Sequence, residues 1–351
     1  MQNSLLKICL IIGVVLVLSS SAFPIENGKC TQSTPFDNVT INEKSTPSGL
    51  LTFRWKPKDV IIRFNETITN EGDYSIDIDT YLAQPCSMIN QEIKGPIIYN
   101  PLPDGFETDR WGQKVASYTN VLAPGQAIEL SWEVNATIYT VRSILLPWKM
   151  RGTISEEIQE NYLADDSKYH INDPYIQNIV HEVVGNTKNI LQKAKKLHDY
   201  ITQHLEFYDD GVWDDAITTL RRGNGSCSEY TFAYIALCRA AGIPAQYIGG
   251  TRCREDAPYV DSSFHRIAEI YLPYYGWIPV DAQGDDGSRY KYYCFGSYNN
   301  RFLVLTVDGG LSEYLDWDYI SWHTILPQSE NVKINRSVTW LQWDNAKLLR
   351  P

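Results

Sequence analysis

The pattern of apolar and polar residues changes near residue 150. Between about residues 30 and 150, short segments rich in β-branched and aromatic residues, such as 60–64, 75–79 and 127–132, are separated by glycine-containing turn sequences. No amphipathic helix of useful length interrupts them. We therefore predict an antiparallel β-sandwich domain at residues 30–150.

After Trp148 the apolar residues follow a helical period. They recur from Ile190 to Leu205 along one face, while lysines occupy the other faces, which predicts a surface helix. A second helix is expected over residues 226–241, because Gly242 suits its C-terminal cap and Pro244 cannot continue it. Helices followed by an antiparallel sheet indicate an α+β domain at residues 160–351, and its strands are expected at 246–251, 264–272, 277–281 and 302–307.

The first 22 residues have the features of a signal peptide. Lys7 is followed by an apolar run over residues 8–18 and then by small residues that end at Ala22. A membrane-spanning helix needs about 20 apolar residues, so cleavage after Ala22 is favoured over an uncleaved anchor, which stays the alternative. We expect a secreted or extracytoplasmic protein that touches a membrane, if at all, only through this N-terminal segment.

Charge and cysteine content argue against nucleic-acid binding and against a metal site or cofactor. The chain has 31 Lys+Arg against 42 Asp+Glu and a net charge of −11, which argues against a nucleic-acid partner because phosphate binding needs a basic face. The cysteines show no zinc-type spacing, and we expect neither a metal site nor a cofactor. In an oxidising compartment Cys30 could pair with Cys86 and Cys253 with Cys294, which would leave Cys227 reduced.

Cys227 lies at the predicted start of the second helix. Unpaired backbone N–H groups and the positive end of the helix dipole stabilise a thiolate there, and the same groups could hold the oxyanion of a tetrahedral intermediate. The glycines at 223 and 225 allow a sharp turn and a close substrate approach. A lone cysteine at a helix start is more often a packing residue, so a nucleophile also needs a base.

His265 is the histidine with the right sequence context for that base. It begins a predicted strand that is followed by a turn and by a second strand ending at Asp281. Adjacent strands lie ~4.8 Å apart, so this hairpin would place the Asp281 carboxylate beside the imidazole and orient it. His198 and His204 lie on the lysine-rich helix, where we expect them to be exposed. The order Cys227, His265, Asp281 predicts a catalytic triad.

Four linked motifs resemble the core of the transglutaminase-like superfamily. They are the stretch from Gly225 to Tyr230, the LCRAAGIPA sequence at 237–245, the strand from His265, and the GWIPVD sequence at 276–281. The resemblance covers about residues 160–310 and implies a papain-like fold, with Cys227 as nucleophile, His265 as base and Asp281 as its orienting carboxylate. The chemistry of the family is acyl transfer from amides, by crosslinking, deamidation or peptide hydrolysis. An exported chain with a sandwich before this core also resembles prokaryotic members described as cysteine proteases.

Two positions depart from the family pattern. Members usually have His-Ala-Trp at the base, whereas this chain has His265-Arg266-Ile267, and Ala282-Gln283 replaces the frequent Pro-Thr. For Glu269, which lies on the same strand face as His265, we expect a supporting polar contact.

The sequence predicts a thiol enzyme that acts on amide bonds of proteins or peptides. Hydrolysis is favoured over glutamine–amine crosslinking, because water is always present and no amine-binding site is visible. The backbone N–H of Cys227 is one expected oxyanion donor, and Trp213 is the candidate for the second. The alternative from another class is a catalytically silent cell-surface binding scaffold, which the loss of the family tryptophan at Ile267 favours.

Overall fold

Two long antiparallel strands organise the strand-rich part of the chain in the computed structural model, which describes residues 51–290 and 292–345. Strand β1 (Thr52–Asn70) pairs with β6 (Ala127–Ser143), so that Phe64 lies opposite Trp132. Buried and more exposed residues alternate along much of both strands, which is the period of a strand with one inner face. The rings of Phe64 and Trp132 stack on that inner face with their centroids 5.6 Å apart.

These strands belong to the larger of two antiparallel sheets in the strand-rich part. Besides β1 and β6, this sheet contains β3 (Gln91–Asn100), β10 (Tyr259–Asp261), β13 (Ser297–Tyr298) and β16 (Val332–Asn345). The second sheet has the order β15-β2-β5-β4, formed by Ser321–Leu326, Ile76–Ala83, Lys114–Leu122 and Gly105–Thr108. Residues from both sheets, such as Ile62 and Ile78, are fully buried in one apolar core. The antiparallel sandwich agrees with the sequence prediction.

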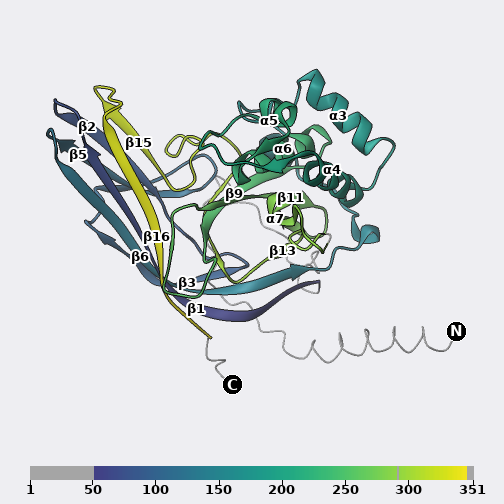
Figure 1. Cartoon of the computed structure of the whole chain (residues 1–351). Helices are drawn as coiled ribbons and strands as arrows, with labels where there is room; N and C mark the ends of the chain where they lie inside the picture. Colours follow the sequence, from purple (N-terminus) through teal and green to yellow (C-terminus); the bar gives the residue numbers. More distant parts are fainter. Residues whose placement is uncertain (1–50, 291, 346–351) are drawn as a thin grey trace. The chain divides into compact units, whose positions relative to one another are not determined.

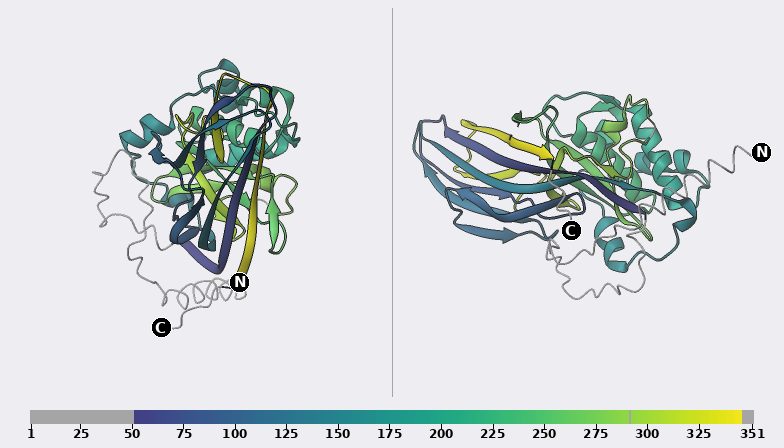
Figure 2. Two further views of the ribbon diagram at one scale, coloured as in Figure 1. Left: turned by 90° about the vertical axis from the view of Figure 1, so that its left-hand side faces the viewer. Right: turned by 90° about the horizontal axis from the view of Figure 1, so that it is seen from below.

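The last two strands return from the C-terminal part of the chain to these sheets. β16 pairs with β1 along most of its length, and β15 pairs with β2 (Figures 1 and 2). We predicted that residues 160–351 form one domain after a sandwich at 30–150, but the pairing joins residues 321–345 to the sandwich sheets. Strand pairing between residues this far apart depends on tertiary contacts, which local sequence patterns do not report. The division of the chain into folding units stays a prediction.

Helix α6 (Cys227–Ala240) is the central element of the α+β core and is buried on nearly all sides. It contacts α3 (Pro174–Val184), α4 (Ile190–His204), α5 (Ala216–Arg222) and an antiparallel sheet of order β12-β11-β9-β14 (Figure 1). The strands of this sheet are β9 (Ala245–Arg252), β11 (His265–Leu272), β12 (Gly276–Val280) and β14 (Phe302–Asp308). The predicted helices, strands and α+β class are therefore confirmed.

Several short elements connect this framework. They are the 3₁₀-helix η3 (Pro147–Lys149), α2 (Glu156–Tyr162), β7 (Glu206–Phe207), β8 (Asn224–Gly225) and α7 (Ala282–Asp285). Within residues 51–290 and 292–345, no helix is both long and apolar enough to cross a membrane. The predicted signal peptide at residues 1–22 and Cys30 lie outside the described residues, so the predicted pairing of Cys30 with Cys86 does too.

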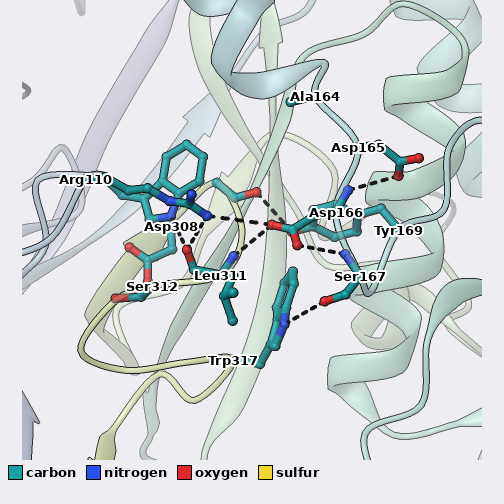
Figure 3. Close-up of polar contacts among 12 residues, drawn as sticks. Arg110, Ala164, Asp165, Asp166, Ser167, Tyr169, Asp308, Leu311, Ser312 and Trp317 are labelled. Atoms are coloured by element: carbon teal, nitrogen blue, oxygen red, sulfur yellow. Dashed lines mark hydrogen bonds and ion pairs between the residues drawn. The ribbon is translucent and has the colours of Figure 1, made fainter.

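Asp166 joins three segments that are far apart in the sequence (Figure 3). Its carboxylate accepts hydrogen bonds from the backbone N–H groups of Leu311 at 3.0 Å and Ser167 at 2.7 Å, and a guanidinium nitrogen of Arg110 lies 3.9 Å away. A Cβ atom added to Gly310 would overlap the carboxylate. Glycine at this position therefore allows the loop after β14 to approach the start of the helical region.

Candidate active site

Cys227 is the first residue of α6, and the turn before it is tightly packed. Ser226 is the N-cap residue, and its backbone N–H donates to Oε2 of the buried Glu229 at 2.7 Å. A Cβ atom at Gly225 would lie 2.7 Å from the Glu229 Cβ, so only glycine fits there without a shift. This packing holds Cys227 where the first N–H groups of the helix have no partner within the helix.

His265 and Asp281 lie together on the neighbouring sheet. His265 begins β11, and Asp281 follows β12 as the N-cap residue of α7. The imidazole Nε2 lies 2.8 Å from the Asp281 Oδ2, and Oδ1 of the same carboxylate accepts the Gly284 N–H at 2.8 Å. Both carboxylate oxygens are thus engaged, which holds the imidazole in one orientation. The ring nitrogen Nδ1 is left for the hydrogen bond with the Cys227 thiol.

The charges of the three groups reinforce one another. Burial alone would raise the pKa of the Cys227 thiol, but the hydrogen bond and charge of His265, together with Arg266, lower it. Burial would lower the pKa of His265, yet Asp281 and Cys227 raise it to about 10. Burial would raise the pKa of Asp281, but His265, the Gly284 N–H and the charge of Arg252 together lower it. At neutral pH these directions favour a thiolate–imidazolium pair, which is the reactive form of a cysteine nucleophile.

Arg266 is a further charged group next to Cys227. Its side chain is fully buried, and its guanidinium carbon lies 4.4–4.7 Å from the ring centroids of four aromatic residues, which are Trp213, Phe232, Tyr247 and Tyr319. One guanidinium nitrogen donates to the Trp317 carbonyl, while Nε and Nη1 have no hydrogen-bond partner among the described residues. The Arg266 backbone N–H and positive charge both favour the Cys227 thiolate. The buried guanidinium is thus a second positive charge, besides the His265 imidazolium, that favours the Cys227 thiolate.

The sheet face that carries His265 lines a cavity of about 300 Å³. Ile267, two residues along β11, lines the same cavity together with Asp281. Ile267 stands where the resemblance to the superfamily implies a tryptophan, so this departure changes the cavity wall and leaves the His265–Asp281 contact in place.

Comparison with known proteins identifies a family match over this part of the chain. Residues 177–282, which include Cys227, His265 and Asp281, match the family model of the transglutaminase-like superfamily. The chain contains a transglutaminase-like core. The crystal structure of a "Putative Cysteine Protease" from Cytophaga hutchinsonii is similar over 85% of this chain and 98% of its own, with a TM-score of 0.59 and 17% identity, which shows a shared fold.

A relative in Haemophilus influenzae, described as an uncharacterized protein, is 30% identical over 150 residues. The match covers 34% of this chain and 41% of that protein, so the chain spans less than half the length of the relative.

The transglutaminase-like core buries one histidine that we expected to be exposed. Only 2% of His198 is accessible, and its Nε2 lies 3.1 Å from the buried Asp285 carboxylate. The prediction for His198 is wrong because α7 and the aromatic rings of Tyr292 and Phe295 pack against α4, so that the buried face of α4 is wider than its apolar stripe. His204 is exposed, as predicted.

Other expectations have different outcomes. Cys253 and Cys294 are both free thiols, so the predicted disulfide between them is wrong. Glu269 makes the expected polar contacts, because its carboxylate accepts hydrogen bonds from the Tyr298 hydroxyl at 2.7 Å and Gln246 at 2.8 Å. Trp213 is one of the four aromatic residues around the Arg266 guanidinium, and its role as an oxyanion donor stays a prediction. The described part of the chain has no group of three or more His, Cys, Asp or Glu residues arranged for a metal ion.

Arg266 is the residue that sequence reasoning missed. Its position was visible only as a departure from the family pattern, and its aromatic neighbours come from separate parts of the chain. The signal that could have found it is that Phe264 and Ala268, two residues away on either side, are apolar. An arginine on such a face is costly to bury unless it has partners.

Proposed function

We propose that this protein is a thiol enzyme that cleaves amide bonds in proteins or peptides. Cys227 would act as the nucleophile, His265 as general base and acid, and Asp281 as the group that orients His265. The observation that carries the proposal is the 2.8 Å contact between His265 and Asp281 beside a cysteine at the N-terminus of α6. The fold relative from Cytophaga hutchinsonii bears a name from the same class of chemistry.

The proposed reaction has two halves. The Cys227 thiolate attacks the amide carbonyl carbon, and the resulting oxyanion accepts hydrogen bonds from N–H groups at the start of α6. His265 then protonates the amine as the carbon–nitrogen bond breaks, which leaves a thioester. In the second half His265 removes a proton from water, the hydroxide oxygen attacks the thioester, and the carbon–sulfur bond breaks to release a carboxylic acid and restore Cys227.

Hydrolysis is proposed over crosslinking because water is always available as the acceptor. Residues 1–22 would direct the enzyme out of the cytoplasm, to a secreted or extracytoplasmic location or to a membrane anchor formed by the uncleaved segment. A protein or peptide is the proposed partner, and the net charge of −11 argues against nucleic acid.

A catalytically silent binding scaffold is the second candidate, and Ile267 in the cavity wall favours it. Thiol reactivity separates the two, because a scaffold needs no thiolate of lowered pKa. The experiment is alkylation of Cys227 with iodoacetamide from pH 4 to 9 on the mature protein, with His265→Ala as the control. We expect fast labelling well below pH 8.5 that slows in the control; slow labelling that is the same in both proteins would refute the proposed nucleophile.

A direct activity measurement completes this test. The mature protein should release amine from a library of unmodified peptides, and Cys227→Ala should abolish the release. Unchanged peptide cleavage by Cys227→Ala would show that another group performs the reaction.

A further inference from the structure

The cavity beside His265 combines residues from the core sheet and from the sandwich. Strand alternation and register place His265, Arg252 and Phe302 on the same face of the core sheet, since His265 lies opposite Gly250 and Phe302 opposite Arg252. Trp55 of β1 and Arg142 of β6 line the cavity as well. The sandwich strands therefore contribute to the walls of the cavity that His265 and Asp281 line.

The charge of this cavity is unusual for an acidic protein. Arg142 and Arg252 both line it, and among the described residues Asp281 is its single carboxylate. Asp281 is already engaged by His265 and by the Gly284 N–H. Two guanidinium groups thus line the cavity, whereas its single carboxylate, Asp281, is already hydrogen-bonded to the His265 imidazole.

The two arginines differ in how they are bound. Arg142 donates to neutral acceptors, which are the carbonyls of Tyr292 and Tyr293 at 3.3 and 2.6 Å and the Ser297 hydroxyl at 3.2 Å. Its side chain is held in place, and no carboxylate within the described residues pairs with it.

Arg252 has no such support for its side chain. Its backbone N–H donates to Asp261 at 2.8 Å. Its guanidinium makes no hydrogen bond or ion pair with the described residues, and its charge acts on Asp281 and Cys294 only at longer range. The side chain is half-buried and lines the cavity. A guanidinium presents five N–H donors in a planar fork that matches a carboxylate. Arg252 is therefore a cationic group in the cavity wall that has donors to offer a ligand.

The strand register gives the position of Arg252 relative to His265. Because Gly250 lies opposite His265, Arg252 is a diagonal neighbour of His265 on the same sheet face. Diagonal neighbours lie roughly 7–8 Å apart, about the length of two extended peptide residues. A group bound by Arg252 would thus lie within about two residues of an amide held at His265, which lines the same cavity.

We propose that Arg252 binds a substrate carboxylate, and that the enzyme acts on amides next to an acidic side chain or a free C-terminal carboxylate. The proposal rests on the proposed function and adds the class of substrate. Arg142 supports it by adding positive charge to the same space, which raises the local concentration of anions. Trp55 and Phe302 supply apolar surface for the rest of the peptide.

Binding is the first test, because it does not depend on turnover. The mature protein is titrated by NMR with acetyl-glutamate amide, with acetyl-alanine and with the neutral acetyl-glutamine amide, while the Arg252 Nε–H signal is followed. We expect at least one carboxylate ligand to bind about tenfold more tightly than the neutral amide. A preference for acetyl-glutamate amide identifies an acidic side chain, and a preference for acetyl-alanine identifies a C-terminal carboxylate.

Variants assign the preference to a residue. Arg252→Gln keeps the length and polarity of the side chain and should remove the tenfold difference. Arg63→Gln is the matched control, because Arg63 forms an exposed ion pair with Glu133 on the sandwich and should retain the difference. Equal binding of all three ligands by the wild-type protein, or an unchanged preference in Arg252→Gln, would overturn the proposal.

The same variants separate this inference from the proposed function. Iodoacetamide labelling of Cys227 in Arg252→Gln should stay fast near pH 6, because His265 and the Gly284 N–H act on Asp281 more strongly than Arg252 does and both contacts are retained. Fast labelling without carboxylate preference refutes only the Arg252 site, whereas carboxylate binding with an unreactive thiol refutes only the proposed catalysis.

Discussion

Replacing Asp281 with asparagine measures how much of the charge on His265 depends on the carboxylate. Asparagine has nearly the same shape, and its side-chain oxygen can still accept the Gly284 N–H that caps α7. The substitution therefore removes the negative charge while it keeps the local turn. We expect His265 to lose most of the stabilisation of its protonated form.

The magnitude follows from the structure. The rise in the pKa of His265 from 6.5 to about 10 corresponds to about 5 kcal/mol, at about 1.4 kcal/mol per unit. Coulomb's law gives a similar value of roughly 6 kcal/mol for unit charges at the 2.8 Å separation, with an effective dielectric constant of about 20. Burial opposes protonation, so the pKa of His265 in Asp281→Asn should fall by at least about two units, which is about 3 kcal/mol.

The assay is an NMR titration of ¹⁵N-labelled histidine between pH 5 and 11, in the wild-type protein and in Asp281→Asn. Gly284→Ala is a second variant, because a Cβ atom there would lie 2.5 Å from the Asp281 Oδ2 and would displace the carboxylate without removing its charge. It should lower the pKa of His265 by a smaller amount. A pKa of His265 in Asp281→Asn within half a unit of the wild-type value would refute the ion-pair argument.

Three further predictions concern stability and the thiolate. Gly310→Ala should destabilise the fold by about 1–3 kcal/mol in urea unfolding, because the added Cβ overlaps the Asp166 carboxylate; a change below about 0.5 kcal/mol would contradict that packing. Arg266→Met should shift the alkylation of Cys227 to higher pH, because it removes a positive charge that favours the thiolate, and an unchanged labelling profile would contradict this role. The raised pKa of His265 implies stability that is complete below about pH 6.5 and lost as the pH rises towards about 10; unfolding at pH 6 and 9 should show this loss, and it should be smaller in Asp281→Asn.

The local parts of the candidate site follow from short-range features of the sequence. Helix α6 starts at Cys227 because a glycine turn precedes this residue and a capping glutamate follows it within a few residues. The pair His265 and Asp281 belongs to a hairpin whose strands are separated by a short turn. Caps, turns and alternation act over short sequence distances, so their physical causes are visible in the sequence.

The charged and aromatic neighbours of these groups depend on tertiary packing. The pairing of β16 with β1, the burial of His198 beside Asp285, the aromatic residues around Arg266 and the two arginines of the cavity all join residues far apart in the chain. Such contacts depend on how helices and sheets pack, and one-dimensional periodicity carries no information about the partner across an interface. Local propensity therefore predicts where Cys227, His265 and Asp281 lie on their elements, and packing sets the charge and the cavity in which they would act.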